Sequence, residues 1–184
     1  MERDEWIEKL SQKSSFLLAI DGMCGSGKST LALTLHQKLG GHLFHMDDFF
    51  LPPELRTPQR LSEPGGNVHY ERFLETVLKP LVSQQTVHYQ RFDCQTMTLQ
   101  KAIDIPYHPF NIIEGSYALH PALQEYYSDV IVLKISPSLQ KERLMKRNPE
   151  KIDDFLGRWI PMENQYFEAF DIFEKYPVYE IEHI

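Results

Sequence analysis

A glycine-rich segment early in the chain has the residue types and the spacing of a phosphate-binding loop. It reads Gly22-Met-Cys-Gly-Ser-Gly-Lys-Ser29 and matches G-x-x-x-x-G-K-[ST] at every fixed position. Glycines let the backbone wrap closely, so that its N–H groups point at phosphate oxygens, and the following helix adds its positive dipole end. The lysine brings a positive charge, and the serine hydroxyl is a ligand that suits Mg²⁺. The segment predicts a site for the β- and γ-phosphates of a nucleotide, formed by Gly22, Gly25, Ser26, Gly27, Lys28, Ser29 and Thr30.

Two further segments place carboxylates directly after short apolar runs. Asp47 and Asp48 follow the run at residues 43–46, and Glu114 follows the run at residues 110–113. Because the carboxyl ends of parallel strands meet at one edge of a sheet, we expect these carboxylates beside the phosphate loop. One of the two aspartates can orient a hydroxyl acceptor and take its proton, and Glu114 can hold Mg²⁺ directly or through water. The simpler alternatives are an aspartate pair that caps a turn and a solvated glutamate.

A pair of arginines is spaced to share one face of a helix. Arg143 and Arg147 lie four positions apart, just before Asn148-Pro149, and Arg158 follows beyond them. A phosphoryl group in transfer concentrates negative charge on its oxygens, and mobile cations that arrive with the substrates stabilise that charge. We therefore expect Arg143 and Arg147 to act from a small lid at about residues 143–158.

The elements that must position these residues follow from the hydrophobic pattern. Apolar runs alternate with helical patterns, which favours a three-layer α/β fold with a mainly parallel sheet and helices on both faces. The expected strands are residues 16–20, 43–46, 110–113, 130–135 and 178–181. The expected helices are residues 31–39, 70–81, 137–147 and 153–174, with a loop at residues 51–67 and a hairpin at residues 86–99.

Composition limits the classes of protein to which the chain can belong. Its 184 residues, of which 42% are hydrophobic, are enough for one domain over residues 1–184. The formal net charge of -7 argues against a nucleic-acid partner. The two cysteines, Cys24 and Cys94, form no CxxC motif. There is no signal-peptide pattern and no apolar stretch of membrane length, so the expectation is a cytoplasmic protein with no membrane partner.

Taken in order, these segments resemble the uridine kinase and phosphoribulokinase family, which also includes nicotinamide riboside and pantothenate kinases. The resemblance covers about residues 16–147 and rests on the loop at 22–29, Asp47-Asp48-Phe49-Phe50, Ile113-Glu114-Gly115 and the two arginines. It implies a P-loop (Walker A) kinase that transfers the γ-phosphoryl group of ATP, with Mg²⁺, to a hydroxyl of a small molecule. By this resemblance the catalytic residues are Lys28, Asp47, Arg143 and Arg147, and the metal residues are Ser29 and Glu114.

The acceptor side departs from the family pattern. His69 stands where the family has an acid, residues 89–93 only approximate its tyrosine-and-acid stretch, and its extended R-D lid sequence is missing. The candidate acceptor residues are Asp48, His69, Tyr89, Arg91 and Asp93. A nucleoside is the first expectation for the acceptor, and pantothenate, nicotinamide riboside or a sugar phosphate are the alternatives.

The motifs of two other classes of nucleotide-binding protein are missing from the sequence. A GTPase would need an N-K-x-D segment and an ABC-type ATPase a signature motif, and the sequence contains neither. A non-catalytic module that senses ATP stays open, although a sensor has no use for a base at Asp47. Assembly into a homo-oligomer also stays open.

Overall fold

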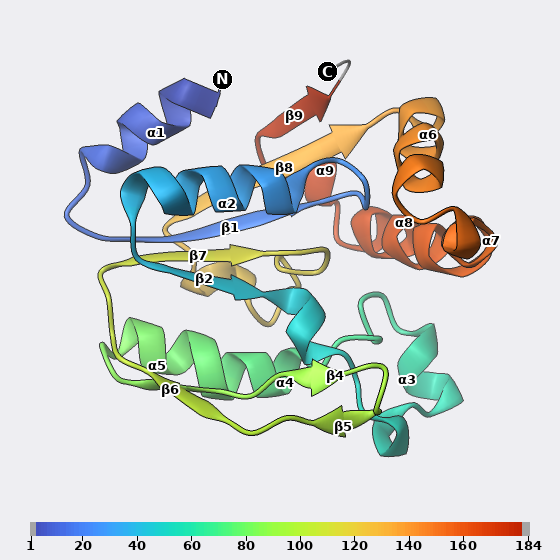
Figure 1. The fold of residues 1–184 in the computed structure, drawn as a ribbon, viewed down its shortest axis with the longest axis horizontal. Coiled ribbons are helices and arrows are strands. Elements are labelled where there is room, and N and C mark those ends of the chain that lie inside the picture. Colours follow the sequence, from blue (N-terminus) through green and yellow to red (C-terminus); the bar gives the residue numbers. More distant parts are fainter. Residues whose placement is uncertain (1–2, 182–184) are drawn as a thin grey trace.

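The apolar runs identified in the sequence form the strands of one parallel sheet (Figure 1). The computed structural model describes residues 3–181. The strands of this sheet are β1 (Phe16–Gly22), β2 (His42–His45), β7 (Phe110–Glu114), β8 (Asp129–Ile135) and β9 (Val178–Ile181). Their order is β2-β7-β1-β8-β9, and all pairings are parallel. The expected class, an α/β fold with a mainly parallel sheet, is confirmed.

The helices and short turns complete the chain. The α-helices are α1 (Arg3–Ser11), α2 (Lys28–Leu39), α3 (Pro58–Ser62), α4 (Tyr70–Phe73), α5 (Lys79–Val82), α6 (Pro137–Arg147), α7 (Ile152–Asp154), α8 (Ile160–Ala169) and α9 (Ile172–Lys175). The 3₁₀ turns are η1 (Met46–Phe49), η2 (Pro53–Leu55), η4 (Gln124–Tyr126) and η5 (Pro149–Lys151), and the π-helical turns are η3 (Leu74–Leu78) and η6 (Phe155–Trp159). No helix within residues 3–181 is long and apolar enough to cross a membrane.

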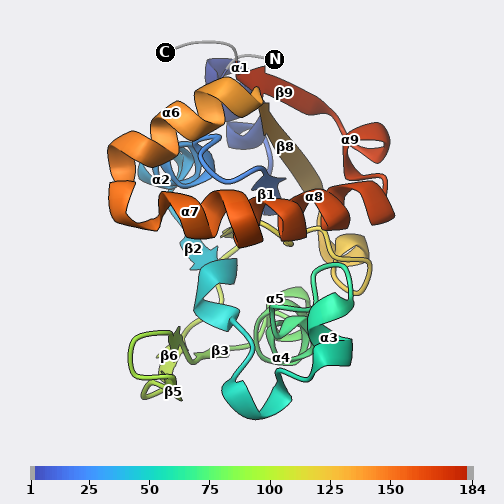
Figure 2. The ribbon, with the colours of Figure 1, turned by 90° about the vertical axis from the view of Figure 1, so that its right-hand side faces the viewer.

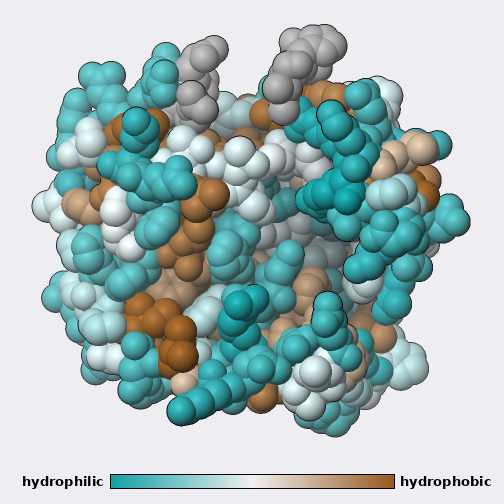
Figure 3. Space-filling view, viewed as in Figure 1, coloured by the Kyte–Doolittle hydropathy of each residue, from teal (hydrophilic) through white to brown (hydrophobic). Residues whose placement is uncertain are grey.

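Helices cover both faces of the sheet because its central strand buries side chains on both sides. In β1, Leu18 and Ile20 pack with α1 and α2, whereas Leu17 and Ala19 pack on the opposite face. That second face is covered by the helical segment from α4 to α5 and by α8 and α9 (Figures 1 and 2). The face seen in Figure 3 is mostly hydrophilic, with hydrophobic side chains in small groups. The result is the three-layer arrangement that the alternating pattern predicts.

Register brings the carboxyl ends of the central strands together. Ile20 of β1 lies opposite Glu114 of β7, and Gly22 lies opposite Leu133 of β8. Gly22 has φ 135°, and a Cβ added there would lie 2.1 Å from the Leu133 carbonyl oxygen. A larger residue at this position would therefore push the phosphate loop away from β8. Glycine is required here by close approach as well as by backbone conformation.

Three expected elements differ from the structure. The hairpin expected at residues 86–99 is two small antiparallel pairs, β3 (Val87–Tyr89) with β6 (Ile103–Ile105) and β4 (Phe92–Asp93) with β5 (Thr98–Leu99). The loop at 51–67 contains α3, which Thr57 caps by accepting a hydrogen bond from Arg60 N. The helix expected at 153–174 is broken at Asp171, whose φ of 51° is left-handed. Aspartate tolerates this conformation better than most residues, so one position can end α8 and start α9.

The helix expected at residues 70–81 is continuous, but it contains a π-helical turn. Turn η3 ends two residues before Pro80, and turn η6 ends two residues before Pro161. Proline has no N–H to donate to the preceding turn, and a widened turn accommodates that loss without ending the helix. Both prolines therefore lie inside helical segments instead of breaking them.

A buried carboxylate joins β1 to α8 below the phosphate loop. Asp21 is fully buried, and it accepts hydrogen bonds from Gly22 N at 2.6 Å, Leu119 N at 2.9 Å and the Tyr166 hydroxyl at 2.7 Å. Burial raises the pKa of Asp21 to about 6, although these hydrogen bonds and the charge of Lys28 act in the opposite direction. The folded chain therefore loses the Asp21 proton at a higher pH than the unfolded chain does.

We expect Asp21 to lower the free energy of unfolding as the pH rises from about 4 to about 6. In that range the unfolded chain has lost the Asp21 proton and the folded chain still holds it, so deprotonation favours unfolding. The pKa difference corresponds to about 3 kcal/mol once the pH exceeds both values. Urea unfolding of the wild type and of Asp21→Asn at pH 4 to 7 measures the effect as a change in their stability difference. Parallel pH profiles for the two proteins would contradict it.

Candidate active site

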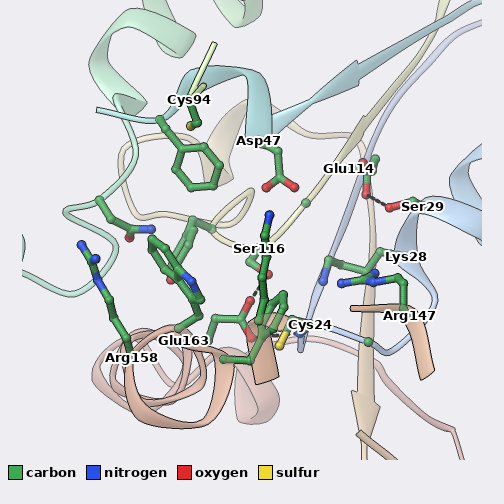
Figure 4. A pocket seen from close by; sticks show the side chains of 18 of the residues that line it. Cys24, Lys28, Ser29, Asp47, Cys94, Glu114, Ser116, Arg147, Arg158 and Glu163 are labelled. Carbon is green, nitrogen blue, oxygen red and sulfur yellow. Dashed lines mark hydrogen bonds between the residues drawn. The ribbon is translucent and has the colours of Figure 1, made fainter. Parts of the chain in front are cut away.

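A cavity of about 620 Å³ lies at the carboxyl edge of the sheet. Its walls include the phosphate loop, Asp47 after β2, Glu114 at the end of β7 and residues of η6 and α8 (Figure 4). Lys28 and Arg147 lie near one another at one end, Arg158 lies at the other end, and Asp47 lies between them in the view of Figure 4. Residues from distant parts of the sequence therefore share one space.

The phosphate loop has the geometry of an anion cradle. Gly27 adopts the left-handed conformation, with φ 98°, directly before α2, and the first N–H groups of that helix have no intrahelical acceptor. Lys28 Nζ donates to the carbonyls of Gly22 at 2.7 Å and Met23 at 3.0 Å, which fixes the amine across the loop. The Ser26 hydroxyl is buried without a partner among the described residues. Free donors, a fixed cation and the helix dipole together suit the phosphates of a nucleotide.

Oxygen ligands for a cation meet between α2 and β7. Ser29 Oγ donates to Glu114 Oε2 at 3.1 Å (Figure 4), and Glu114 Oε1 lies 2.5 Å from His45 Nδ1. The hydrogen bond to Glu114 raises the pKa of His45. A hydroxyl and a carboxylate at this separation are hard donors of the kind that bind Mg²⁺ beside phosphates, so the residues present fit that ion.

The two neighbouring aspartates have different surroundings. The side chain of Asp47 points into the cavity. Its surface is accessible to solvent that fills the cavity, but the surrounding cavity walls reduce its contact with bulk water. This enclosure raises the pKa of Asp47, the charge of Lys28 lowers it, and the nearby Glu114 raises it further. Asp48 is buried, and it accepts hydrogen bonds from the Tyr89 hydroxyl at 2.6 Å and from Arg91 Nε at 2.8 Å. Asp47 is free to meet a substrate, whereas Asp48 holds β3 and the segment after it against η1.

The residues expected to contact the acceptor lie elsewhere. Tyr89 and Arg91 both donate to Asp48, and none of these three residues is among those that line the cavity. His69 lines a separate cavity of about 160 Å³, and Asp93 accepts a hydrogen bond from Gln95 N at 2.7 Å in an exposed turn. Their assignment as acceptor residues stays a prediction that this geometry does not favour.

The two arginines of α6 are used differently. Arg143 Nη1 donates to the Gly25 carbonyl at 3.1 Å, so this side chain supports the phosphate loop from behind. Arg147 is exposed, lines the cavity, and bonds through Nε to Asn148 Oδ1 at 2.9 Å. The geometry leaves the remaining guanidinium nitrogens of Arg147 available to a bound anion.

If the phosphoryl transfer from ATP that the sequence leads us to expect takes place in this cavity, Arg147→Ala should lower kcat about 10²-fold with little change in the KM for ATP, because the charge of Arg147 would act on the group in transfer. Arg143→Ala should instead raise the KM for ATP, since it loosens the loop at Gly25. Steady-state kinetics of both variants separate the two roles. Lys146→Ala, an exposed cation on the same helix, is the control and should match the wild type. Normal turnover in Arg147→Ala would show that this arginine is a surface charge.

A buried glutamate from α8, which was not among the site residues expected from the sequence, also lines the cavity. Glu163 accepts hydrogen bonds from Cys24 N at 2.9 Å and from the Ser116 hydroxyl at 2.6 Å (Figure 4). Burial raises the pKa of Cys24 to about 12, so its thiol stays protonated. The contact of Cys24 with Glu163 is made by its backbone N–H. A signal was present, because Glu163 shares a helix face with Tyr166 and Phe167, where a carboxylate is out of place.

Comparison with solved structures identifies the fold. No protein-family model matches the sequence, and no curated protein sequence matches it. A structure of a possible uridine kinase from Bacillus stearothermophilus is 19% identical over 98% of this chain and 97% of that one, with a TM-score of 0.71. A proposed fructose transport system kinase from Silicibacter sp. TM1040 is 22% identical over 92% and 89%, with a TM-score of 0.66.

A third structure extends the same likeness. YFH7 from Saccharomyces cerevisiae is described as a proposed P-loop kinase with a circular permutation. It is 13% identical to this chain, the match covers 100% of both chains, and the TM-score is 0.69. All three structures superpose on this chain over 89% or more of their own lengths. The chain therefore has the same three-layer α/β fold as these structures.

Proposed function

We propose that this chain is a kinase that transfers the γ-phosphoryl group of ATP to a hydroxyl of a small molecule. The observation that carries the proposal is the position of Asp47 in one cavity with Lys28 and with the Ser29–Glu114 pair. A phosphate site, an oxygen site for a cation and a free carboxylate are the groups that phosphoryl transfer to a hydroxyl needs. The kinase names of the structural neighbours agree with this function.

The residues of the chain have separate tasks in this reaction. Lys28 and the loop N–H groups would hold the β- and γ-phosphates, and Ser29 and Glu114 would hold Mg²⁺. The ion, when bound, neutralises negative charge on the phosphates. Asp47 would accept a hydrogen bond from the acceptor hydroxyl and orient its oxygen toward the γ-phosphorus. It would take the proton as the new O–P bond forms and the bond from the γ-phosphorus to the bridging oxygen of the departing ADP breaks. Arg147 would add positive charge and help to exclude water, which otherwise competes as the acceptor.

A module that binds ATP without turning it over is the second candidate. The position of Asp47 does not favour this candidate, because a protein that only senses ATP gains nothing from an enclosed carboxylate that faces the phosphate site. A nucleoside, pantothenate, nicotinamide riboside and a sugar phosphate all remain candidate acceptors for a kinase.

Acceptor-dependent release of ADP tests the proposal. The purified chain is mixed with ATP and Mg²⁺, and hydroxyl-bearing metabolites are added one at a time while a coupled assay follows ADP. A kinase releases ADP at an increased rate with one class of acceptor, and mass spectrometry then finds that acceptor heavier by one phosphoryl group. Binding of ATP with no increase for any acceptor, and no phosphorylated product, would favour the sensor.

A further inference from the structure

The end of the cavity away from the phosphate loop carries unpaired positive charge. Arg158 lies at that end, opposite Lys28 (Figure 4). Arg56 also lines the cavity, and its guanidinium carbon lies 5.9 Å from the centre of the ring of Phe92, two residues before Cys94, which Figure 4 places toward the same end. Two guanidinium groups thus lie on the far side of Asp47, where the body of an acceptor must extend when its hydroxyl meets that carboxylate.

Neither arginine is neutralised by the protein. Within residues 3–181 no carboxylate lies within ion-pair distance of Arg56 or Arg158. Arg56 donates through Nε to the Leu51 carbonyl at 2.6 Å, which aims the group and leaves its two terminal nitrogens free. The Arg158 guanidinium carbon lies 4.6 Å from the centre of the Trp159 ring, a stacking contact that uses none of its N–H donors.

The charge balance of the walls differs from that of the whole chain. The formal net charge of the chain is -7, yet five cationic side chains and three carboxylates line the cavity. Two of the carboxylates are already engaged, Glu114 by Ser29 and His45 and Glu163 by Ser116 and Cys24 N. Lys28 and Arg147 lie at the phosphate end, so Arg56, Lys151 and Arg158 remain, and the two guanidinium groups among them are left for a second anion.

We infer that the acceptor is a hydroxyl compound that also carries an anionic group, a phosphomonoester or a carboxylate, held by Arg56 and Arg158. The inference rests on the proposed function. Planar guanidinium groups bind both anions through paired N–H donors. Phe50 and Trp159, whose ring centres are 6.4 Å apart, line the cavity as well and would flank the middle of such a molecule. The acceptor side selects for charge, and a neutral nucleoside would leave both arginines unpaired.

Matched acceptors test this selection. ADP release is measured with a sugar and its monophosphate, with a hydroxy acid and its primary amide, and with a nucleoside and its monophosphate. We expect kcat/KM at least about tenfold higher for the anionic member of the productive pair.

Arg158→Gln should remove most of that preference by raising the KM for the anionic acceptor, while the KM for ATP stays constant, and Arg56→Gln should act in the same direction. Lys141→Gln, an exposed cation outside the cavity, is the control. Turnover of the neutral members alone would overturn the inference and leave the kinase function standing.

A binding experiment needs no turnover. In Trp6→Phe, Trp159 is the remaining tryptophan, and its fluorescence is followed while a non-hydrolysable ATP analogue saturates the phosphate loop. Inorganic phosphate, acetate or chloride is then added at equal ionic strength. A saturable change with phosphate alone indicates a phosphomonoester acceptor, and a change with acetate indicates a carboxylate. Both changes should be lost in Arg158→Gln. A response no larger than that to chloride would overturn the inference, whereas saturable binding without any phosphorylated product in the acceptor assay would overturn the kinase function instead.

Discussion

Asp47→Asn is expected to lower kcat about 10³-fold while the affinity for ATP changes little, because a general base contributes in the chemical step. Asparagine keeps the size of the side chain and can still contact a hydroxyl, but it cannot take the proton. The wild type should lose activity as the pH falls through the pKa of Asp47, which enclosure by the cavity raises above 3.8. This acid limb should be missing from the residual activity of the variant. Steady-state kinetics from pH 4 to 8, with the productive acceptor, measure both effects.

Asp48→Asn is the matched control for that experiment. Asp48 accepts hydrogen bonds from Tyr89 and Arg91 and does not line the cavity. Asp48→Asn should therefore lower the melting temperature, and it should lower kcat much less than Asp47→Asn does. The reverse ranking of the two variants in kcat would show that Asp48, and not Asp47, is the base.

Lys28→Ala is expected to reduce turnover about 10³-fold, since it removes a positive charge that is fixed beside the transferring group. Its amine bonds to two carbonyls of the phosphate loop, so the variant should also bind ATP more weakly. The sheet and both hydrophobic layers do not depend on this side chain, and circular dichroism should be unchanged. Turnover and ATP binding are measured together, so that the two losses can be separated.

Lys38→Ala supplies the comparison for the lysine. Lys38 lies at the other end of α2 and is exposed, so the variant carries the same change of charge on the same helix. It should turn over normally. Near-normal turnover in Lys28→Ala, with Lys38→Ala also normal, would remove the phosphate loop from the mechanism.

The phosphate loop could be recognised in the sequence because its residues are contiguous. Residues 22–29 run from the end of β1 through a short turn into the start of α2, so residues close along the chain are also close in three dimensions. The central strands β1, β7 and β8 were recognisable for a related reason, since each is a short, largely apolar run of mostly buried residues. Strands of two or three residues, such as β4 and β5, carry no readable period, and their pairing could not be predicted.

The sequence by itself determined the candidate groups for phosphoryl transfer, namely the loop at 22–29, Asp47 and Glu114. Only the tertiary structure decided which groups are free to perform it. Glu163 meets Cys24 N across 139 positions, and Arg91 engages Asp48 across 43. The same packing leaves Asp47 open to the cavity and Arg56 and Arg158 without carboxylate partners among the described residues. The physical reason is that a side chain's availability depends on its neighbours in space, and long-range packing sets those neighbours without leaving a local pattern in the sequence.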